Sequence, residues 1–208
     1  MKQVLDLADR IQEMRNRMPA EQSLLAGISG IDASGKGFVA EKVDDVLQRR
    51  GIRTALIRAD DWLDLPDVRF GDGDRGLHFY ENALRLDQMF EQLILPLQRC
   101  RSIFTSADLA TETGHEYYKG RYRFDNVDVI LVEGIFIFKK LCADHFDLRV
   151  WIDCPFETSL QRAIERSQEG LDPQRTIAVY ETIYFPAQRI HLEADDPRLN
   201  ADLVIDNG

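Results

Sequence analysis

The stretch GISGIDASGKGFVAEKV, residues 27–43, decides how the chain is interpreted. Gly30, Gly35 and Lys36 fit the pattern G-x-x-x-x-G-K, which is typical of a loop that binds phosphate groups. The next position of that pattern is normally Ser or Thr, whose hydroxyl holds a magnesium ion. Gly37 stands there instead. The stretch is therefore either a nucleotide site with an altered part or a glycine-rich turn.

The surroundings of the motif favour a phosphate-binding loop. Residues 23–29 form an apolar run of strand length before it, and a helical pattern follows from Gly35 until Gly51 supplies a C-terminal cap. Glycines let backbone N–H groups approach phosphate closely, and a helix N-terminus attracts anions. Lys36 can then reach the terminal phosphates. The alternative is a strand-to-helix turn that carries a surface lysine.

Composition limits the classes of protein to consider. The chain has 208 residues, 44% of them hydrophobic and 30% charged, which suits one domain over residues 1–208. A net charge of −10 disfavours a nucleic-acid partner. The three cysteines are scattered, so neither a disulfide framework nor a zinc site is indicated. No apolar run approaches the length of a membrane span, and we expect a cytoplasmic protein; whether it forms a homo-oligomer stays open.

Strands and helices alternate along the chain, which predicts an α/β fold. The apolar strands are continuous, as expected for a mainly parallel sheet of five strands with helices on both faces. Residues 63–77 are rich in Asp, Gly and Pro and predict a loop, and 107–124 predict a hairpin or excursion after a short strand at 101–105. The other predicted strands are 53–59, 127–138, 148–154 and 201–206, and the helices are 4–18, 79–97 (ended near Pro96), 155–167 and 176–192.

Two acidic residues follow predicted strands and are candidates for the chemistry. Asp60 ends the run 53–59, and Glu133 ends the apolar part of 127–138. A phosphate loop needs carboxylates near its magnesium ion, delivered from the ends of neighbouring strands. Each acid alone is more simply a strand cap or a solvent-facing group, but with the loop the functional interpretation is favoured. We expect Asp61 to be solvated and Asp153 to cap the helix after it.

At this point the chain resembles the family of uridine kinases and phosphoribulokinases. The resemblance rests on GISGIDASGKG, IRADDWL, VILVEGIF and the terminal ADLVIDNG, and it runs from about Leu24 to the end. It implies a phosphate-loop kinase fold, with the N-terminal helix (residues 1–18) as an extra or divergent element packed on the domain. It also implies transfer of the terminal phosphate of ATP, with Mg²⁺, to a hydroxyl of a small molecule.

The resemblance implies roles for particular residues. Asp60 matches the aspartate that orients and deprotonates the acceptor hydroxyl. Glu133 matches the acid near the metal ion, and Asp60 is also expected near that ion. Lys36 is implied as catalytic as well as phosphate-binding. The nucleotide-binding set is Gly30, Ala33, Ser34, Gly35, Lys36, Gly37 and Phe38.

Three features depart from the family. Gly37 replaces the loop hydroxyl, and Leu63 stands where the family has a tyrosine. The arginine-rich lid is represented only by Arg162, Arg166 and Arg175, each of which could instead form a helix salt bridge. Lid arginines stabilise the transferring phosphate and help to exclude water.

The segment TETGHEYYKGRYRF occupies the place of the family's nucleoside pocket. His115, Tyr117 and Tyr118 are the candidates for contacting the acceptor, and a solvated hairpin is an equal alternative. The sequence thus predicts a small-molecule kinase, with a nucleoside such as uridine or cytidine as the nearest named acceptor. The competing prediction is a regulatory nucleotide-binding module without transfer activity. A GTPase is disfavoured because no N-K-x-D motif occurs.

Overall fold

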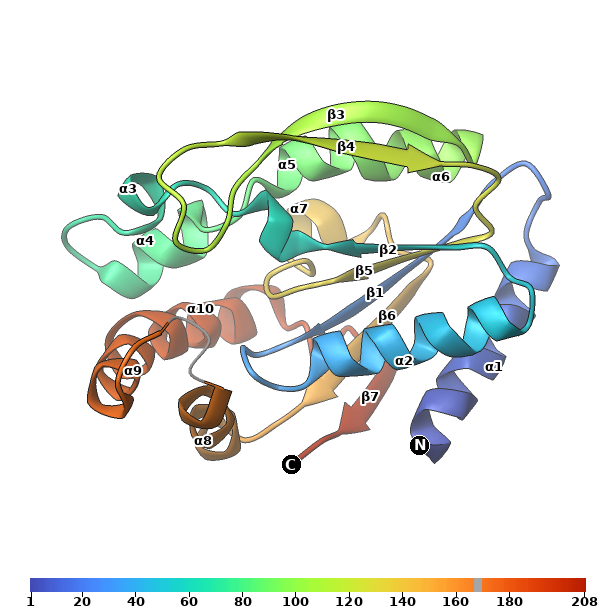
Figure 1. Cartoon of the computed structure of the whole chain (residues 1–208). Coiled ribbons are helices and arrows are strands. Elements are labelled where there is room, and N and C mark those ends of the chain that lie inside the picture. Colours follow the sequence, from blue (N-terminus) through green and yellow to red (C-terminus); the bar gives the residue numbers. More distant parts are fainter. Residues whose placement is uncertain (167–169) are drawn as a thin grey trace.

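The computed structural model describes residues 1–166 and 170–208, and its centre is a five-stranded sheet. The strands are β1 (Leu24–Gly30), β2 (Thr54–Arg58), β5 (Val129–Glu133), β6 (Leu148–Asp153) and β7 (Leu203–Asp206). They lie in the order β2-β5-β1-β6-β7, and every neighbouring pair is parallel. The predicted fold class is confirmed. All carboxyl ends point the same way, to the left in Figure 1.

Helices cover both faces of this sheet, so its strands are buried on two sides. On one face α1 (Lys2–Arg17) and α2 (Lys36–Arg49) pack on Leu24 and other alternate strand residues. Leu25 points to the opposite layer. The helices on that side are α4 (Arg75–Asn82), α5 (Leu86–Met89), α6 (Leu95–Cys100), α7 (Lys140–Ala143) and α10 (Phe185–Asp195). None of the helices over the described ranges is long and apolar enough to cross a membrane.

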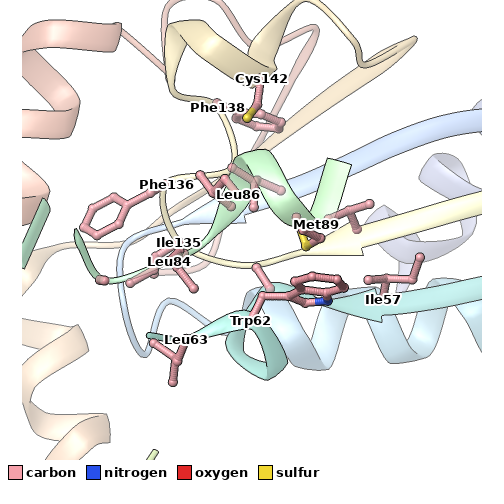
Figure 2. Close-up of a cluster of buried hydrophobic side chains, with 14 of the residues drawn as sticks. Ile57, Trp62, Leu63, Leu84, Leu86, Met89, Ile135, Phe136, Phe138 and Cys142 are labelled. Carbon is pink, nitrogen blue, oxygen red and sulfur yellow. The ribbon is translucent and has the colours of Figure 1, made fainter. Parts of the chain in front are cut away.

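The apolar layer on this second face anchors the short 3-10 turn η1 (Ala59–Trp62) that follows β2. Figure 2 shows Trp62 with Met89 of α5 and Ile57 of β2. The Trp62 side chain is fully buried. Burial of a large apolar side chain stabilises the fold by about 1.5–3 kcal/mol. Because Asp60 lies in the same turn, this packing also fixes the position of the candidate catalytic acid.

The predicted helix 79–97 is wrong in its limits. The helix α4 begins earlier, at Arg75, and breaks before α5; a π-helical turn, η2 (Phe90–Ile94), then joins α5 to α6, which ends at Cys100. Pro96 does not end the helix. Proline lacks an N–H and its ring collides with the carbonyl four residues back, and the π turn relieves this conflict. Another π turn, η3 (Tyr180–Tyr184), precedes Pro186 in the same way.

Other boundaries also differ from expectation. The predicted loop 63–77 contains a short helix, α3 (Pro66–Arg69), and the start of α4. The short strand predicted over 101–105 and the hairpin or excursion predicted over 107–124 form one hairpin, in which β3 (Ile103–Leu109) pairs antiparallel with β4 (Tyr118–Phe124). The helix α8 (Phe156–Arg166) matches the predicted helix 155–167, whose last residue lies outside the described residues. The helix predicted over 176–192 begins earlier, as α9 (Pro173–Val179), and continues through η3 and α10 to Asp195.

The strand predicted over 127–138 stops at Glu133. A Cβ on Gly134 would lie only 2.4 Å from the Cβ of Ala59, so the chain passes η1 at a point where only glycine fits. Phe136 then adopts a left-handed backbone with φ of 59°, and the chain leaves the sheet. The carboxylate of Glu133 is thereby left at the edge where the loop and η1 meet.

Candidate active site

The loop between β1 and α2 has the backbone that a phosphate site requires. Gly35 precedes the first residue of α2 in the left-handed region, with φ of 91°, and Ala33 has φ of 50°. A Cβ on Gly35 would also lie 2.5 Å from Nδ2 of Asn207. A Cβ on Gly30 would lie 2.6 Å from Oγ of Ser34 and 2.7 Å from a backbone oxygen of β6. Both motif glycines are therefore required by close packing, and Gly35 also by its conformation.

The N-terminus of α2 carries no competing negative charge of its own. No side chain caps it, and its first turn contains no acidic residue. The first N–H groups of a helix, here those of Lys36, Gly37 and Phe38, have no intrahelical carbonyl partner. They form a site for an anion such as a phosphate group. The Phe38 side chain is 61% exposed, so this residue contributes through its backbone.

Two carboxylates lie beside this loop, as the sequence predicts. Glu133 ends β5, whose neighbours are β1 on one side and β2 on the other. It pairs in register with Ile28 and with Arg58, and Asp60 follows Arg58 by two residues. Lys36 is buried and interacts electrostatically with both acids. The strand order therefore brings Lys36, Asp60 and Glu133 together from three separate parts of the chain.

Burial changes the proton affinity of both acids. Desolvation raises the pKa of Glu133 to about 7, with Lys36 opposing the rise and Asp60 adding to it. Desolvation also raises the pKa of Asp60, again against the positive charge of Lys36. Asp60 remains open to solvent where it faces the cleft, although protein surrounds it on the other sides. A carboxylate with a raised pKa is a better proton acceptor than an ordinary aspartate.

Arg58 is a site residue that the sequence analysis missed. Its guanidinium lies 2.7 Å from Oε1 of Glu41 and 3.9 Å from Oε1 of Glu133. Both Arg58 and Glu41 are about half exposed, so the pair adds little stability. The effect of Arg58 is to place a positive charge beside Glu133. Only the register between β2 and β5, which no local pattern reveals, could have pointed to it.

The residues present fit a magnesium ion that is held mainly by a nucleotide. Within residues 1–166 and 170–208, no group of three or more metal-binding side chains is assembled. Magnesium keeps several water ligands and needs only one or two carboxylates in addition to phosphate oxygens. Asp60 and Glu133 can supply these carboxylates. A Cβ on Gly37 would lie 3.7 Å from Oε1 of Glu133, at ordinary contact distance. The space left by the missing loop hydroxyl therefore borders the Glu133 carboxylate.

A cleft of about 510 Å³ extends from the loop into the space between η1, the β3–β4 ribbon and α10. The loop end is polar and includes Lys36, Asp60 and Glu133. The far end combines six aromatic or apolar side chains with four polar or charged ones. The far-end residues are Leu63, Arg69, Phe79, Ala110, Thr111, Glu112, Tyr118, Ile135, Tyr184 and Gln188. This shape can hold a phosphate chain at one end and a small acceptor at the other.

The predicted lid and acceptor residues do not all reach the cleft. Arg166 and Tyr118 line it, whereas Arg162 contacts the loop from outside, with Nη1 3.4 Å from the Ser34 carbonyl oxygen. The hydroxyl of Tyr117 donates to Asp64, away from the cleft wall. His115 is exposed and does not line the cleft either. Arg175 is largely exposed and pairs with Asp172.

Residues from distant segments support the loop, and most were not foreseen. Nδ2 of Asn207 donates to the Ser34 carbonyl at 2.7 Å, and Oγ of Ser159 donates to the Asp32 carbonyl at 2.7 Å. The Tyr180 hydroxyl donates to the Asp32 carboxylate. The resemblance of the terminal ADLVIDNG to a kinase segment was the one available signal, and it did not single out Asn207. These bonds hold the outer edge of the loop in place.

Comparison with solved structures supports the same fold. A possible uridine kinase from Bacillus stearothermophilus is 23% identical with a TM-score of 0.71, and the match covers 97% of this chain and all of that one. A phosphoribulokinase from Rhodobacter spheroides is 13% identical with a TM-score of 0.62, covering 90% and 71%. A D-glycerate 3-kinase from Cryptococcus neoformans is 12% identical with a TM-score of 0.63, covering 93% and 88%.

No protein-family model matches the chain. The structural matches extend over nearly the whole sequence, from the N-terminal helix to β7 in the first case. These matches therefore confirm the resemblance to uridine kinases and phosphoribulokinases that the loop and strand motifs indicate. The chain has the fold of these phosphate-loop kinases.

Proposed function

We propose that this protein is an ATP-dependent kinase that transfers the terminal phosphate of ATP to a hydroxyl of a small molecule. The observation that carries the proposal is the position of Asp60. Asp60 lines the cleft that the phosphate loop borders, together with the aromatic, apolar and polar residues of the far end. A protein that only binds nucleotide does not require an acceptor-facing carboxylate beside the loop.

The loop has a binding and positioning role in this mechanism. Backbone N–H groups at the start of α2 hold the phosphates, and the Lys36 ammonium neutralises charge on the group being transferred. Phosphoryl transfer depends on positioning and charge stabilisation more than on covalent chemistry. Arg166 lines the same cleft and would add positive charge near the transferred group.

Asp60 acts as the general base. The acceptor hydroxyl oxygen forms a bond to the terminal phosphorus, the bond from that phosphorus to the bridging oxygen breaks, and ADP leaves with the bridging oxygen. The hydroxyl proton moves to the Asp60 carboxylate, whose raised pKa suits this acceptance. Magnesium, when bound near Asp60 and Glu133, neutralises charge on the phosphate oxygens.

A nucleoside is the nearest named acceptor, because a possible uridine kinase matches 97% of the chain in its fold. Tyr118 on the cleft wall is compatible with stacking on a base. The positions of His115 and Tyr117 give this assignment no further support. Kinase activity is thus proposed for the site as a whole, and the nucleoside is proposed as the first acceptor to test.

A regulatory module that binds nucleotide without transferring phosphate is the second candidate. Gly37 favours it, because the loop hydroxyl is missing. Measuring ADP formation with and without uridine, cytidine, sugars and D-glycerate separates the two functions. A kinase gives acceptor-stimulated ADP release that Asp60→Asn abolishes. Tight magnesium–ATP binding with no stimulation by any acceptor would identify the module.

A further inference from the structure

One face of a long helical segment lines the cleft. Helices α9 and α10 are joined by the π turn η3, and together they run from Pro173 to Asp195. Four residues of this segment line the cleft at intervals of four: Thr176, Tyr180, Tyr184 and Gln188. They form a stripe that begins near the phosphate loop, where Tyr180 donates to Asp32, and reaches the far compartment at Gln188.

The π turn explains how this stripe stays aligned. In a regular α-helix each residue turns by about 100°, so a spacing of four advances by about 40° and twelve residues drift by about 120°. One extra residue in a π turn removes about 100° of that drift and leaves about 20°. Tyr180 and Tyr184 bound the turn itself. The distortion therefore keeps Gln188 on the cleft side of the helix.

Gln188 is an unusual residue for the position it occupies. Its side chain is only 2% exposed, and neither Nε2 nor Oε1 has a hydrogen-bond partner among the described residues. A buried polar group left unsatisfied costs about 1–3 kcal/mol. Its companions on the wall, Phe79 and Tyr184, are largely buried aromatic residues, against which an apolar side chain would pack without this cost.

The backbone around Gln188 is closely packed. A Cβ on Gly76 of α4 would lie 2.5 Å from Cβ of Pro186 and 3.2 Å from the backbone nitrogen of Ala187. Ala187 is fully buried. The two helices therefore touch backbone to backbone directly before Gln188. The contact with α4 therefore fixes the position of Gln188 at the cleft wall.

We propose that Gln188 determines acceptor specificity by hydrogen bonding two adjacent hydroxyl groups of the substrate. A carboxamide presents one acceptor oxygen beside an NH₂ donor, and a vicinal diol offers the complementary pair. A carboxylate on the acceptor would offer no donor to Oε1. The inference rests on the proposed kinase function and narrows its substrate class to compounds that carry a vicinal diol, such as a ribonucleoside or a sugar.

Thermal unfolding without ligands tests whether the carboxamide is unsatisfied. Gln188→Met keeps the approximate size and removes both polar atoms, so we expect the Tm to rise by roughly 2–8 °C. Gln174→Met, on the exposed face of the same helical segment, is the matched control and should leave the Tm nearly unchanged. A fall in the Tm of Gln188→Met would show that the carboxamide is bonded within the fold, for instance through a buried water, and would overturn the proposal.

Steady-state kinetics with uridine beside 2′-deoxyuridine, which lacks the vicinal diol, tests recognition. The native protein should favour the diol compound by about tenfold or more in kcat/KM, because a lost partner leaves buried polar groups unpaired. Gln188→Met should lose this preference while the KM for ATP stays constant. Equal preference in both proteins would overturn the assignment. If no compound stimulates ADP formation by the native protein, the kinase proposal fails, and the unfolding result still decides whether Gln188 is unsatisfied.

Discussion

Gly37→Ser tests how the loop works without its usual hydroxyl. A Cβ at this position would meet the Glu133 carboxylate at 3.7–3.8 Å, which is ordinary van der Waals contact. The residue lies in the first turn of α2. Glycine costs about 1 kcal/mol relative to alanine in a helix, and serine lies between them. We therefore expect Gly37→Ser to stabilise the protein by about 0.5 kcal/mol, a Tm rise of about 1–2 °C.

The introduced hydroxyl would lie beside Glu133, where magnesium is proposed to bind. We expect turnover to be retained and half-maximal activity to be reached at an equal or lower magnesium concentration. Gly37→Ala is the matched control, since it adds the same Cβ without an oxygen; it should gain about 1 kcal/mol of stability at most and leave the magnesium dependence unchanged. The assay is ADP release over a magnesium titration at saturating ATP.

Two results would refute this reasoning. If both variants fold but lose activity, the Cβ itself occupies space that a substrate or a moving loop requires. If the native protein binds no nucleotide in a magnesium-dependent way, as measured by calorimetry, the loop does not form the proposed site. Loss of activity in Gly37→Ser alone would show that the introduced hydroxyl forms a hydrogen bond to Glu133 and does not bind the metal ion.

Three further predictions concern the charged residues of the site. Lys36→Ala should strongly weaken ATP binding measured by calorimetry while the circular dichroism spectrum is kept; unchanged affinity would contradict the phosphate-loop assignment. Asp60→Asn should leave ATP binding nearly intact and reduce transfer by roughly a hundredfold to ten-thousandfold, and full activity would move the base to another residue, Asp61 first. Glu133 binds its proton more tightly in the folded protein than in the unfolded chain, since its pKa is raised from 4.5 to about 7. Without magnesium and nucleotide, the free energy of unfolding should therefore fall as the pH rises from 4.5 to about 7. The expected fall from Glu133 is on the order of 1 kcal/mol per pH unit. Glu133→Gln should flatten this part of the profile in urea unfolding, and identical pH slopes in the two proteins would disprove the assignment.

Local signals were sufficient for the phosphate loop and for the order of elements. Gly35 requires a positive φ that glycine adopts at no steric cost, and the apolar run before it can only be a buried strand of a parallel sheet. Asp60 and Glu133 were predicted because each stands at the end of a predicted strand. The helix limits near Pro96 were wrong because a π turn, which depends on packing in the folded protein, absorbs the proline.

The acceptor side of the cleft could not be predicted in the same way. Tyr118, the first residue of β4, was foreseen, but Tyr117, which precedes the strand, turns to Asp64. Gln188 gave no sequence signal, since one glutamine in an amphipathic helix is ordinarily exposed. Its burial depends on the π turn and on the close contact of α4 with α10 at Gly76.

The sequence by itself determined the parallel α/β architecture, the phosphate loop and the two carboxylates, because periodicity, glycine conformation and strand ends are local properties. Only the tertiary structure decided which charges meet and what forms the far wall. Arg58 reaches Glu133 through strand register, and Asn207 reaches Ser34 across a sequence separation of 173 residues. Such contacts arise from the packing of elements that lie far apart in the chain, and no pattern within a single segment encodes them.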